Sequence, residues 1–465
     1  MRRLSAALAA LVLGLSAMVC ASAVELKADQ IRPFDDNVIT VSSEEGGLLT
    51  IEAVSGSVPL ENPVTDMKIG PGTVDIPWAA LTYGGEPLQT GKVTLRATLR
   101  GSDRTTEAAE IRTAVGKPVP AVVACLPASR TFYADGKNQL KIECAVSNHG
   151  AIELSIAPKA DPENEVWHFK TTYSDKAPLV IRWDGRGKDR SPCPPGDYVI
   201  SAWSVARSGY VQTAEVTLLS EPLPEPALAL TGPLIPEDLS DDAAVWAALI
   251  SPVVVGEGPE GKGLYIMADK TAGAGRIASV SCRTVGVEVL EICDDHWVKI
   301  GVWRQPDGVY TEGWVKDDKL TVIRPNTSFG AVLDKKAQTL TVYKDGKKLG
   351  TVLVSTGYIT PEDRNADTHS GVYLMGARME GFNRDGHTYH YPVRIDGSNL
   401  IHQAGFALLD GERDFAEELA VLGMKASHGC IRVDPRFTEE NGGINAWWIW
   451  THMGHDCKIM ITPEE

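Results

Sequence analysis

Apolar and polar residues alternate along two long stretches of the chain, residues 24–116 and residues 117–224. Alternation with a period of two is typical of β-strands that turn one face to a core and the other to water. Gly and Pro residues break both stretches at short intervals, as turns between strands require. The pattern therefore predicts two all-β units in the first half of the chain.

The two stretches also match each other at a constant offset. Residues 74–78 read Val-x-Ile-x-Trp, and residues 179–183 read Leu-x-Ile-x-Trp. Residues 91–97 read Gly-x-Val-x-Leu-x-Ala, and residues 196–202 read Gly-x-Tyr-x-Ile-x-Ala. Both pairs are offset by 105 residues without a gap. We therefore expect a tandem pair of β-sandwich domains, a first repeat at 24–116 and a second at 117–224.

The second copy carries Trp183-Asp184-Gly185 and a Pro-Pro-Gly-Asp-Tyr string at 194–198. In these residues it resembles the immunoglobulin-like domain of flagellar hook-capping proteins. The resemblance covers about one pair of strands, and it implies a fold, not a flagellar role.

A Pro-rich stretch follows the sandwiches, with prolines at 222, 224, 226, 233 and 236. Such a segment is stiff, and we interpret residues 225–239 as a linker. Residues 240–326 form a further compact β unit, with a strand pattern at 287–300 and Gly-Trp-Val at 313–315. This unit resembles a bacterial Src-homology-3-like barrel, which is common in wall-associated proteins. It either binds the wall or a peptide, or it is a spacer whose Trp residues belong to the core.

The last segment, residues 327–465, contains many short strand patterns. They lie at 331–336, 339–343, 353–356, 371–375, 389–395, 400–402 and 458–461. Asp345-Gly346 predicts a tight hairpin turn. Helical periodicity is confined to 413–422 and to 444–452, where we expect a packing helix with three Trp residues. The predicted fold class is therefore mostly β and multidomain, with tandem sandwiches, a small barrel and a final β-rich domain that carries short helices.

The first 23 residues differ from the rest of the chain. Arg2 and Arg3 precede an apolar run at 4–19, and Ala21-Ser22-Ala23 follows it. This arrangement predicts a signal peptide at 1–23, and we expect no membrane-spanning segment in the mature chain. Removal of the two arginines changes the formal charge from −16 to −18. An acidic chain without a basic stripe is not expected to bind nucleic acid, and a secreted or cell-envelope location is expected.

Seven cysteines remain after the predicted cleavage, so at least one thiol has no partner within the chain. An exported protein can form disulfides. The locally closest candidate pairs are Cys125 with Cys144 and Cys282 with Cys293.

The segment with the most reactive side chains close together reads Ser427-His428-Gly429-Cys430-Ile431-Arg432. A thiol is a strong nucleophile only as a thiolate, so it requires a base or a cation nearby, and His402 and His428 are the candidate bases. Gly429 allows a substrate backbone to approach closely. The Gly429 and Cys430 amides could donate to an oxyanion, and the Ser427 hydroxyl could orient an imidazole.

The string resembles the signature of the YkuD-type L,D-transpeptidase catalytic domain, and the resemblance extends over residues 328–462. It implies a β-rich fold in which a His and a Cys meet across a cleft. It also implies that Cys430 is the nucleophile that attacks the third residue of a peptidoglycan stem peptide, releases the terminal D-alanine and passes the acyl group to an amine. By the same resemblance His402 is the general acid and base, and Ser427, His428 and Gly429 support the site or form the oxyanion hole. Expected substrate contacts are Arg432, Tyr373 and Gln403.

Two features depart from the family pattern. Gln403 follows His402 where the family usually has Gly or Ser, and the interval from His402 to Cys430 is longer than in compact members. The additional residues, 410–422, predict an acidic amphipathic helix. This insertion is either a lid over the cleft or a surface element packed through Phe415 and Leu419.

Other functions are compatible with parts of the sequence. The same acyl-enzyme could be hydrolysed, which would make the protein an L,D-carboxypeptidase. His428, Cys430, His452, His455 and Cys457 could instead bind zinc, although they lack a Cys-x-x-Cys knuckle. The chain could also be a non-enzymatic wall-binding protein. The favoured prediction is a transpeptidase that acts on stem peptides without a metal or another cofactor.

Overall fold

The chain is described by a computed structural model of residues 24–55, 58–82, 84–173, 178–271, 273–305, 307–361, 363, 366–379, 381–397, 399–438 and 440–464. The predicted signal peptide at 1–23 lies outside the described residues. Strands form most of the regular structure, and the described ranges contain three α-helices. The prediction of a mostly β, multidomain chain is confirmed.

The first sandwich consists of two antiparallel sheets that face each other across one core. One sheet has the order β1-β2-β5, and the other has the order β4-β3-β6-β7. The strands are β1 (Val24–Ala28), β2 (Asn37–Ser43), β3 (Gly47–Ser55), β4 (Val58–Ile69), β5 (Gly72–Trp78), β6 (Gly91–Arg100) and β7 (Thr106–Val115).

The second sandwich repeats this arrangement. Its sheets have the orders β13-β10-β8 and β12-β11-β14-β15-β9, so they match the first sandwich strand for strand, with β9 added. The strands are β8 (Val122–Pro127), β9 (Thr131–Phe132), β10 (Leu140–Val146), β11 (Gly150–Pro158), β12 (Trp167–Tyr173), β13 (Leu179–Trp183), β14 (Gly196–Ser204) and β15 (Arg207–Leu218). The sequence repeat lies on equivalent strands, since Trp78 of β5 and Trp183 of β13 are both buried in their cores.

The barrel-like unit is a seven-stranded sheet of order β18-β17-β21-β20-β19-β16-β22. Its strands are β16 (Val253–Gly256), β17 (Gly263–Met267), β18 (Arg276–Ser281), β19 (Gly286–Ile292), β20 (Trp297–Trp303), β21 (Tyr310–Lys316) and β22 (Leu320–Ile323), and a 3₁₀ turn spans Asp317–Lys319. A helix that the sequence analysis missed, α1 (Asp242–Ile250), precedes the first strand. Val245 and Leu249 of α1 are buried against the final domain.

The final domain is built on an eight-stranded sheet of order β26-β34-β23-β24-β25-β33-β30-β29. Its strands are β23 (Asn326–Asp334), β24 (Thr339–Lys344), β25 (Lys347–Ser355), β26 (Gly371–Leu374), β29 (Val393–Asp396), β30 (Asn399–Gln403), β33 (Ile431–Val433) and β34 (Cys457–Ile461). Two small hairpins lie outside the sheet, β27 (Phe382–Arg384) with β28 (His387–Tyr389), and β31 (Ala407–Leu409) with β32 (Glu412–Asp414). The helices are α2 (Ala416–Ala420) and α3 (Ala446–His452).

Two sequence expectations for this domain need correction. Residues 389–395 are not one strand, because Pro392 lacks an N–H and Tyr391 has φ +58°, so β28 ends at Tyr389 and β29 begins at Val393. The region 413–422 is not one helix either. Its start belongs to the β31–β32 hairpin, which turns at Asp410-Gly411, where both residues have positive φ. The hairpin at Asp345-Gly346 and the Trp-rich packing helix are confirmed.

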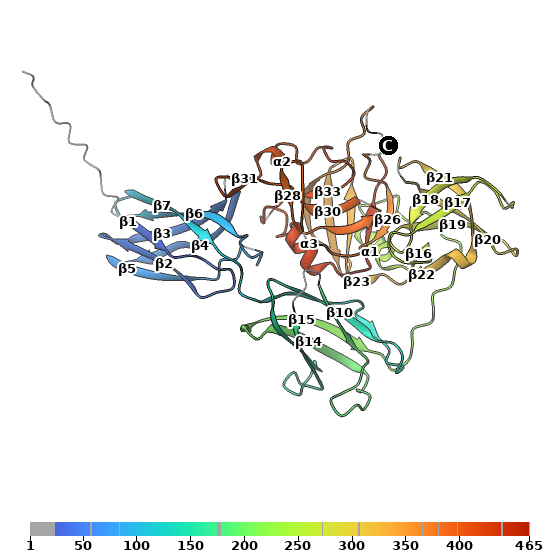
Figure 1. The fold of residues 1–465 in the computed structure, drawn as a ribbon, viewed down its shortest axis with the longest axis horizontal. Coiled ribbons are helices and arrows are strands. Elements are labelled where there is room, and N and C mark those ends of the chain that lie inside the picture. The colour runs from blue at the N-terminus through green and yellow to red at the C-terminus, as the bar shows by residue number, and fades with distance from the viewer. Residues whose placement is uncertain are drawn as a thin grey trace, which may run out of the picture.

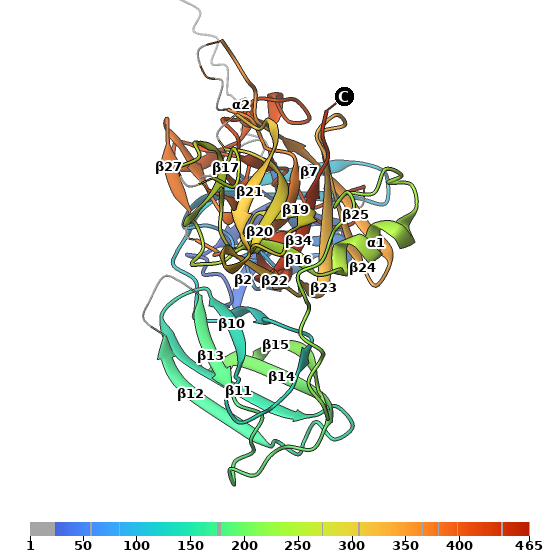
Figure 2. The same ribbon diagram turned by 90° about the vertical axis from the view of Figure 1, so that its right-hand side faces the viewer.

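The final domain lies at the centre of the molecule, with the first sandwich on one side, the barrel on the other and the second sandwich below (Figure 1). The view at right angles shows α1 beside β23, β24 and β25, and its contacts lie on these inner strands and on β34 of the central sheet (Figure 2). The barrel and the final domain share one continuous hydrophobic core. The aromatic face of α3 packs against residues of both sandwiches. The final domain is therefore in direct contact with each of them.

Within the described ranges, no helix has both the length and the apolar character needed to cross a bilayer.

Candidate active site

Two neighbouring parallel strands carry His402 and Cys430. β30 pairs with β33 so that Ile401 lies opposite Ile431 and His402 lies opposite Arg432. Cys430 immediately precedes β33, two residues before Arg432, so period-two alternation places both on the face that also carries His402. The strands are about 4.8 Å apart in such a pair. The fold therefore brings the predicted nucleophile, the predicted base and one guanidinium to a common face.

His402 is held as a neutral imidazole. Its side chain is 2% exposed, and its Nδ1 lies 2.7 Å from the backbone oxygen of Gln403. A carbonyl oxygen can only accept, so Nδ1 carries the proton and Nε2 keeps a free lone pair. Burial lowers the pKa of His402 to about 4. At neutral pH this ring can accept a proton from a thiol.

Cys430 is partly exposed, whereas most other described cysteines are buried. Burial raises the pKa of the Cys430 thiol, and three groups oppose this effect. The Leu400 N–H donates to the sulfur, and the guanidinium groups of Arg432 and Arg384 lie close enough to favour the thiolate. In the resting state the Cys430 thiol and the His402 imidazole are therefore both neutral, so the thiol must lose its proton when it attacks.

The loop before Cys430 has a tightly constrained backbone. Gly429 has φ +112°, and a Cβ at this position would lie 2.5 Å from the Asn399 Oδ1 and 3.0 Å from the Asp367 backbone oxygen. Ser427 Oγ accepts from the Gly429 N–H at 3.2 Å and donates to the Cys430 backbone oxygen at 2.5 Å. Only glycine meets both the conformational and the spatial requirement here.

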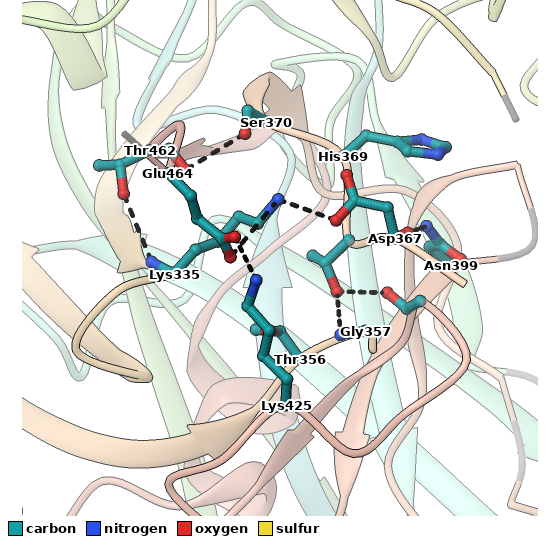
Figure 3. A network of polar contacts seen from close by, with 12 residues as sticks. Lys335, Thr356, Gly357, Asp367, His369, Ser370, Asn399, Lys425, Thr462 and Glu464 are labelled. Atoms are coloured by element: carbon teal, nitrogen blue, oxygen red, sulfur yellow. Dashed lines mark hydrogen bonds and ion pairs between the residues drawn. The ribbon is translucent and has the colours of Figure 1, made fainter. Parts of the chain in front are cut away.

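A polar network contacts this loop through Thr368 (Figure 3). Thr368 Oγ1 accepts from the Gly357 N–H and donates to the Gly429 backbone oxygen, both at 2.8 Å. The neighbouring Asp367 is paired with Lys335 at 2.9 Å, and that lysine is 5% exposed. This network fixes the segment that contacts Gly429 and keeps the nucleophile loop in place.

An aromatic hairpin covers His402. The rings of Phe382 in β27 and Tyr389 in β28 stack on each other at 5.0 Å, and they meet the His402 ring edge-on at 5.4 and 5.0 Å. Phe382 was not predicted as a site residue. The Asp385-Gly386 pair was the available signal, because it is a typical hairpin turn and both residues have positive φ.

The remaining predicted site residues lie in different surroundings. His428 is exposed on the loop before Gly429. Arg432 is partly buried, with Nη1 3.1 Å from Glu418 Oε1 and its guanidinium over the Tyr389 ring at 5.9 Å. Glu418 lies on the inserted helix, and no sequence signal marked it as part of the site.

Tyr373 and Gln403 were expected to contact substrate, and the structure buries both. Tyr373 is 1% exposed in the core, and its hydroxyl donates to the backbone oxygens of His369 and Ser370. Gln403 is also 1% exposed, and alternation turns its side chain away from the face that carries His402. In this conformation Tyr373 supports the sheet, and Gln403 contributes its backbone carbonyl to His402.

The possible zinc ligands do not converge. The His452 ring stacks on Trp448 at 4.4 Å, and Cys457 is fully buried in the core. His455 lies between Glu260 and Asp456, which raise its pKa to about 9. Across the described part of the chain, no group of three or more His, Cys, Asp or Glu residues is arranged to hold a metal ion.

Comparison with known proteins identifies the segment that holds this arrangement. Residues 328–453 match the family model of the L,D-transpeptidase catalytic domain, and this segment contains both His402 and Cys430. No curated protein sequence matches the chain.

Solved structures provide a second comparison. An L,D-transpeptidase from Mycobacterium smegmatis is 15% identical, and the match covers 58% of this chain and 92% of that one with a TM-score of 0.24. L,D-transpeptidase 3 from Mycobacterium tuberculosis is 14% identical, and the match covers 50% of this chain and 89% of that one with a TM-score of 0.24.

Proposed function

We propose that the L,D-transpeptidase catalytic domain formed by residues 328–453 works through a thioester on Cys430, with His402 as its base. The observation that carries the proposal is the shared face of β30 and β33, which carries both a neutral His402 with its proton on Nδ1 and a partly exposed thiol. This is the arrangement that nucleophilic acyl transfer requires.

In the first half-reaction, the Cys430 sulfur attacks the carbonyl carbon of the third residue of a tetrapeptide stem. His402 Nε2 accepts the thiol proton and then donates it to the amine of the departing D-alanine, as the carbon–nitrogen bond breaks. A thioester remains on Cys430. In the second half-reaction an acceptor amine attacks the thioester, His402 takes a proton from that amine, and the thiol is regenerated as the new amide forms.

The negative charge that develops on the carbonyl oxygen requires N–H donors. In the resting structure the Gly429 N–H donates to Ser427 Oγ at 3.2 Å, which is a long bond between neutral groups. A charged oxygen is a stronger acceptor than a hydroxyl, so the developing oxyanion can compete for this donor. Arg432 adds a positive charge on the same face, suited to a substrate carboxylate.

The substrate class places the proposed activity outside the cytoplasmic membrane. Peptidoglycan stem peptides are the proposed partners, and the predicted signal peptide is consistent with export. The barrel and the sandwiches would then hold the catalytic domain at the wall.

Intact-protein mass spectrometry after incubation with a tetrapeptide stem tests the proposal. We expect an increase in mass equal to the tripeptide acyl group, and a carbapenem should likewise acylate the thiol. Cys430→Ala should form neither adduct. Cys293→Ala is the matched control, because Cys293 is the other partly exposed cysteine among the described residues and lies in the barrel.

Two outcomes would contradict the proposal. One is the absence of any adduct on the wild-type protein, and the other is an equal adduct on Cys430→Ala. Adding an amine acceptor then distinguishes transfer from hydrolysis, since a carboxypeptidase would release only trimmed stems.

A further inference from the structure

The insertion between β30 and β33 lies against the first sandwich. Its hairpin, β31 with β32, meets that sandwich at the start of β6, where the Gly411 backbone oxygen accepts from the Lys92 N–H at 3.0 Å. The N-terminal sandwich and this hairpin are adjacent in Figure 1. The insertion therefore contacts both a remote domain and, through α2, the catalytic domain.

Arg413 fixes the insertion to the sandwich. Its backbone N–H donates to Ser55 Oγ at 2.9 Å, and its guanidinium lies 3.8 Å from the Glu86 carboxylate. Both charged side chains are less than 10% exposed. The rings of Phe406 and Phe415 lie beside the same guanidinium. A buried ion pair that loses one partner leaves an uncompensated charge, so this contact resists separation of the two domains.

The helix that follows carries Glu418, whose side chain is 6% exposed. Its Oε1 lies 3.1 Å from Arg432 Nη1 and accepts from the Tyr389 hydroxyl at 3.3 Å. Its Oε2 is buried and has no hydrogen-bond partner in the described part of the chain. A buried carboxylate with one oxygen that accepts no hydrogen bond lowers the stability of the folded protein. A residue kept at such a cost points to a role in function.

Both partners of Glu418 face the catalytic pair. Tyr389 packs edge-on against the His402 ring, and Arg432 lies opposite His402 in the strand register and two residues from Cys430. The guanidinium groups of Arg432 and Arg384 both favour the Cys430 thiolate, and Arg432 also acts on His402. Of these, Arg432 is the one that the carboxylate of Glu418 contacts.

We propose that Glu418 is a positioning residue that holds Arg432 and Tyr389 against the catalytic pair, and that the first sandwich keeps Glu418 in place through Arg413. The inference rests on the proposed function, because it assigns a supporting role around the same thiol. It makes the N-terminal sandwich a structural part of the active site and not only a spacer.

Alkylation of Cys430 by iodoacetamide tests this inference without any stem peptide. The rate is measured by peptide mass mapping between about pH 6 and pH 10 on the full chain. Glu418→Ala releases Arg432, so the thiolate loses a neighbouring cation and alkylation at pH 7.5 slows by about three- to tenfold. Glu418→Gln keeps an oxygen acceptor for both partners and should give an intermediate rate. Arg413→Ala should slow alkylation in the same direction.

Glu417→Gln is the matched control, because it lies on the same helix but its side chain is 83% exposed. It should alkylate at the wild-type rate, and thermal melting confirms that each variant is folded. A wild-type or faster rate in Glu418→Ala would overturn the positioning role. A wild-type rate in Arg413→Ala would overturn the part assigned to the sandwich. Because no substrate is involved, these results are independent of whether Cys430 forms an acyl adduct.

Discussion

At the scale of single residues, the site combines a neutral base with a thiol whose ionisation is suppressed. Burial lowers the pKa of His402 to about 4 and raises that of Cys430. Such a pair reacts only when the thiol proton can pass to the imidazole ring. The reaction rate therefore depends more on the position of the sulfur than on the acidity of the thiol. Gly429 sets the position of the sulfur, because the backbone dihedral angles of this residue determine the direction of the chain at Cys430.

Gly429→Ala should therefore impair both folding and acylation. A positive φ costs an alanine about 1–3 kcal/mol, and its Cβ would lie 2.5 Å from Asn399 Oδ1. Displacement of Cys430 by about 1 Å is expected to lower the acylation rate by about a hundredfold. The measurement is the rate of adduct formation by mass spectrometry, with circular dichroism to verify folding.

Gly423→Ala is a matched control for backbone strain alone. Gly423 also has a positive φ, +84°, but the nearest atom to a Cβ there is 3.9 Å away. This variant should lose some stability and keep the acylation rate. An acylation rate in Gly429→Ala within twofold of wild type would show that the loop tolerates a side chain, against the role given to Gly429.

At the scale of elements, short segments from distant parts of the chain hold the domains together. α1 is the clearest case, because it leads into the barrel but packs its buried residues against β23 and β34 of the catalytic domain. Asp241 caps this helix by accepting from the N–H groups of Ala243 and Ala244 at 3.0 and 3.1 Å. The cap provides an acceptor for backbone N–H groups that would otherwise have none in the first turn of the helix.

Asp241→Ala should lower the free energy of unfolding by about 1 kcal/mol, because the two N–H groups lose their acceptor. Asp241→Asn keeps a side-chain oxygen and should retain most of the stability. Urea denaturation followed by circular dichroism gives the comparison. Equal losses in both variants would show that the charge, and not the cap hydrogen bond, matters at this position.

At the scale of the whole molecule, buried histidines make the assembled protein sensitive to acid. His402 is covered by the aromatic hairpin, and burial near the guanidinium of Arg413 lowers the pKa of His390 to about 3. Both values lie below the unfolded value of about 6.5, so the folded state binds fewer protons than the unfolded state. Their contribution to stability is complete above pH 6.5 and is lost as the pH falls through 4 for His402 and 3 for His390.

The midpoint of urea unfolding should therefore fall as the pH is lowered from 7 toward 4, by an amount equivalent to a few kcal/mol. His390→Gln should reduce this dependence, since one of the histidines with a lowered pKa is removed. His149→Gln, which replaces an exposed histidine of the second sandwich, should leave the dependence unchanged. A midpoint that stays constant between pH 7 and pH 4 would contradict the assignment.

The features that could be predicted from the sequence are those encoded within a few consecutive residues. Period-two alternation located the repeated sandwich strands, Asp345-Gly346 located a hairpin, and the string around Cys430 indicated thiol chemistry, because each signal depends on local geometry or local chemistry. Strand period alone could not separate the strands at 389–395 or show that residues 413–414 belong to a hairpin.

Only the tertiary structure showed which distant side chains surround His402 and Arg432. Phe382 covers His402, and Glu418 contacts Arg432, although neither residue belongs to a recognisable motif. Tyr373 is the opposite case. Its place beside a family motif suggested a substrate contact, but its side chain lies on the strand face that packs into the core. Such relations depend on the path of the chain and on which face of each strand meets a neighbour, and no local pattern contains that information.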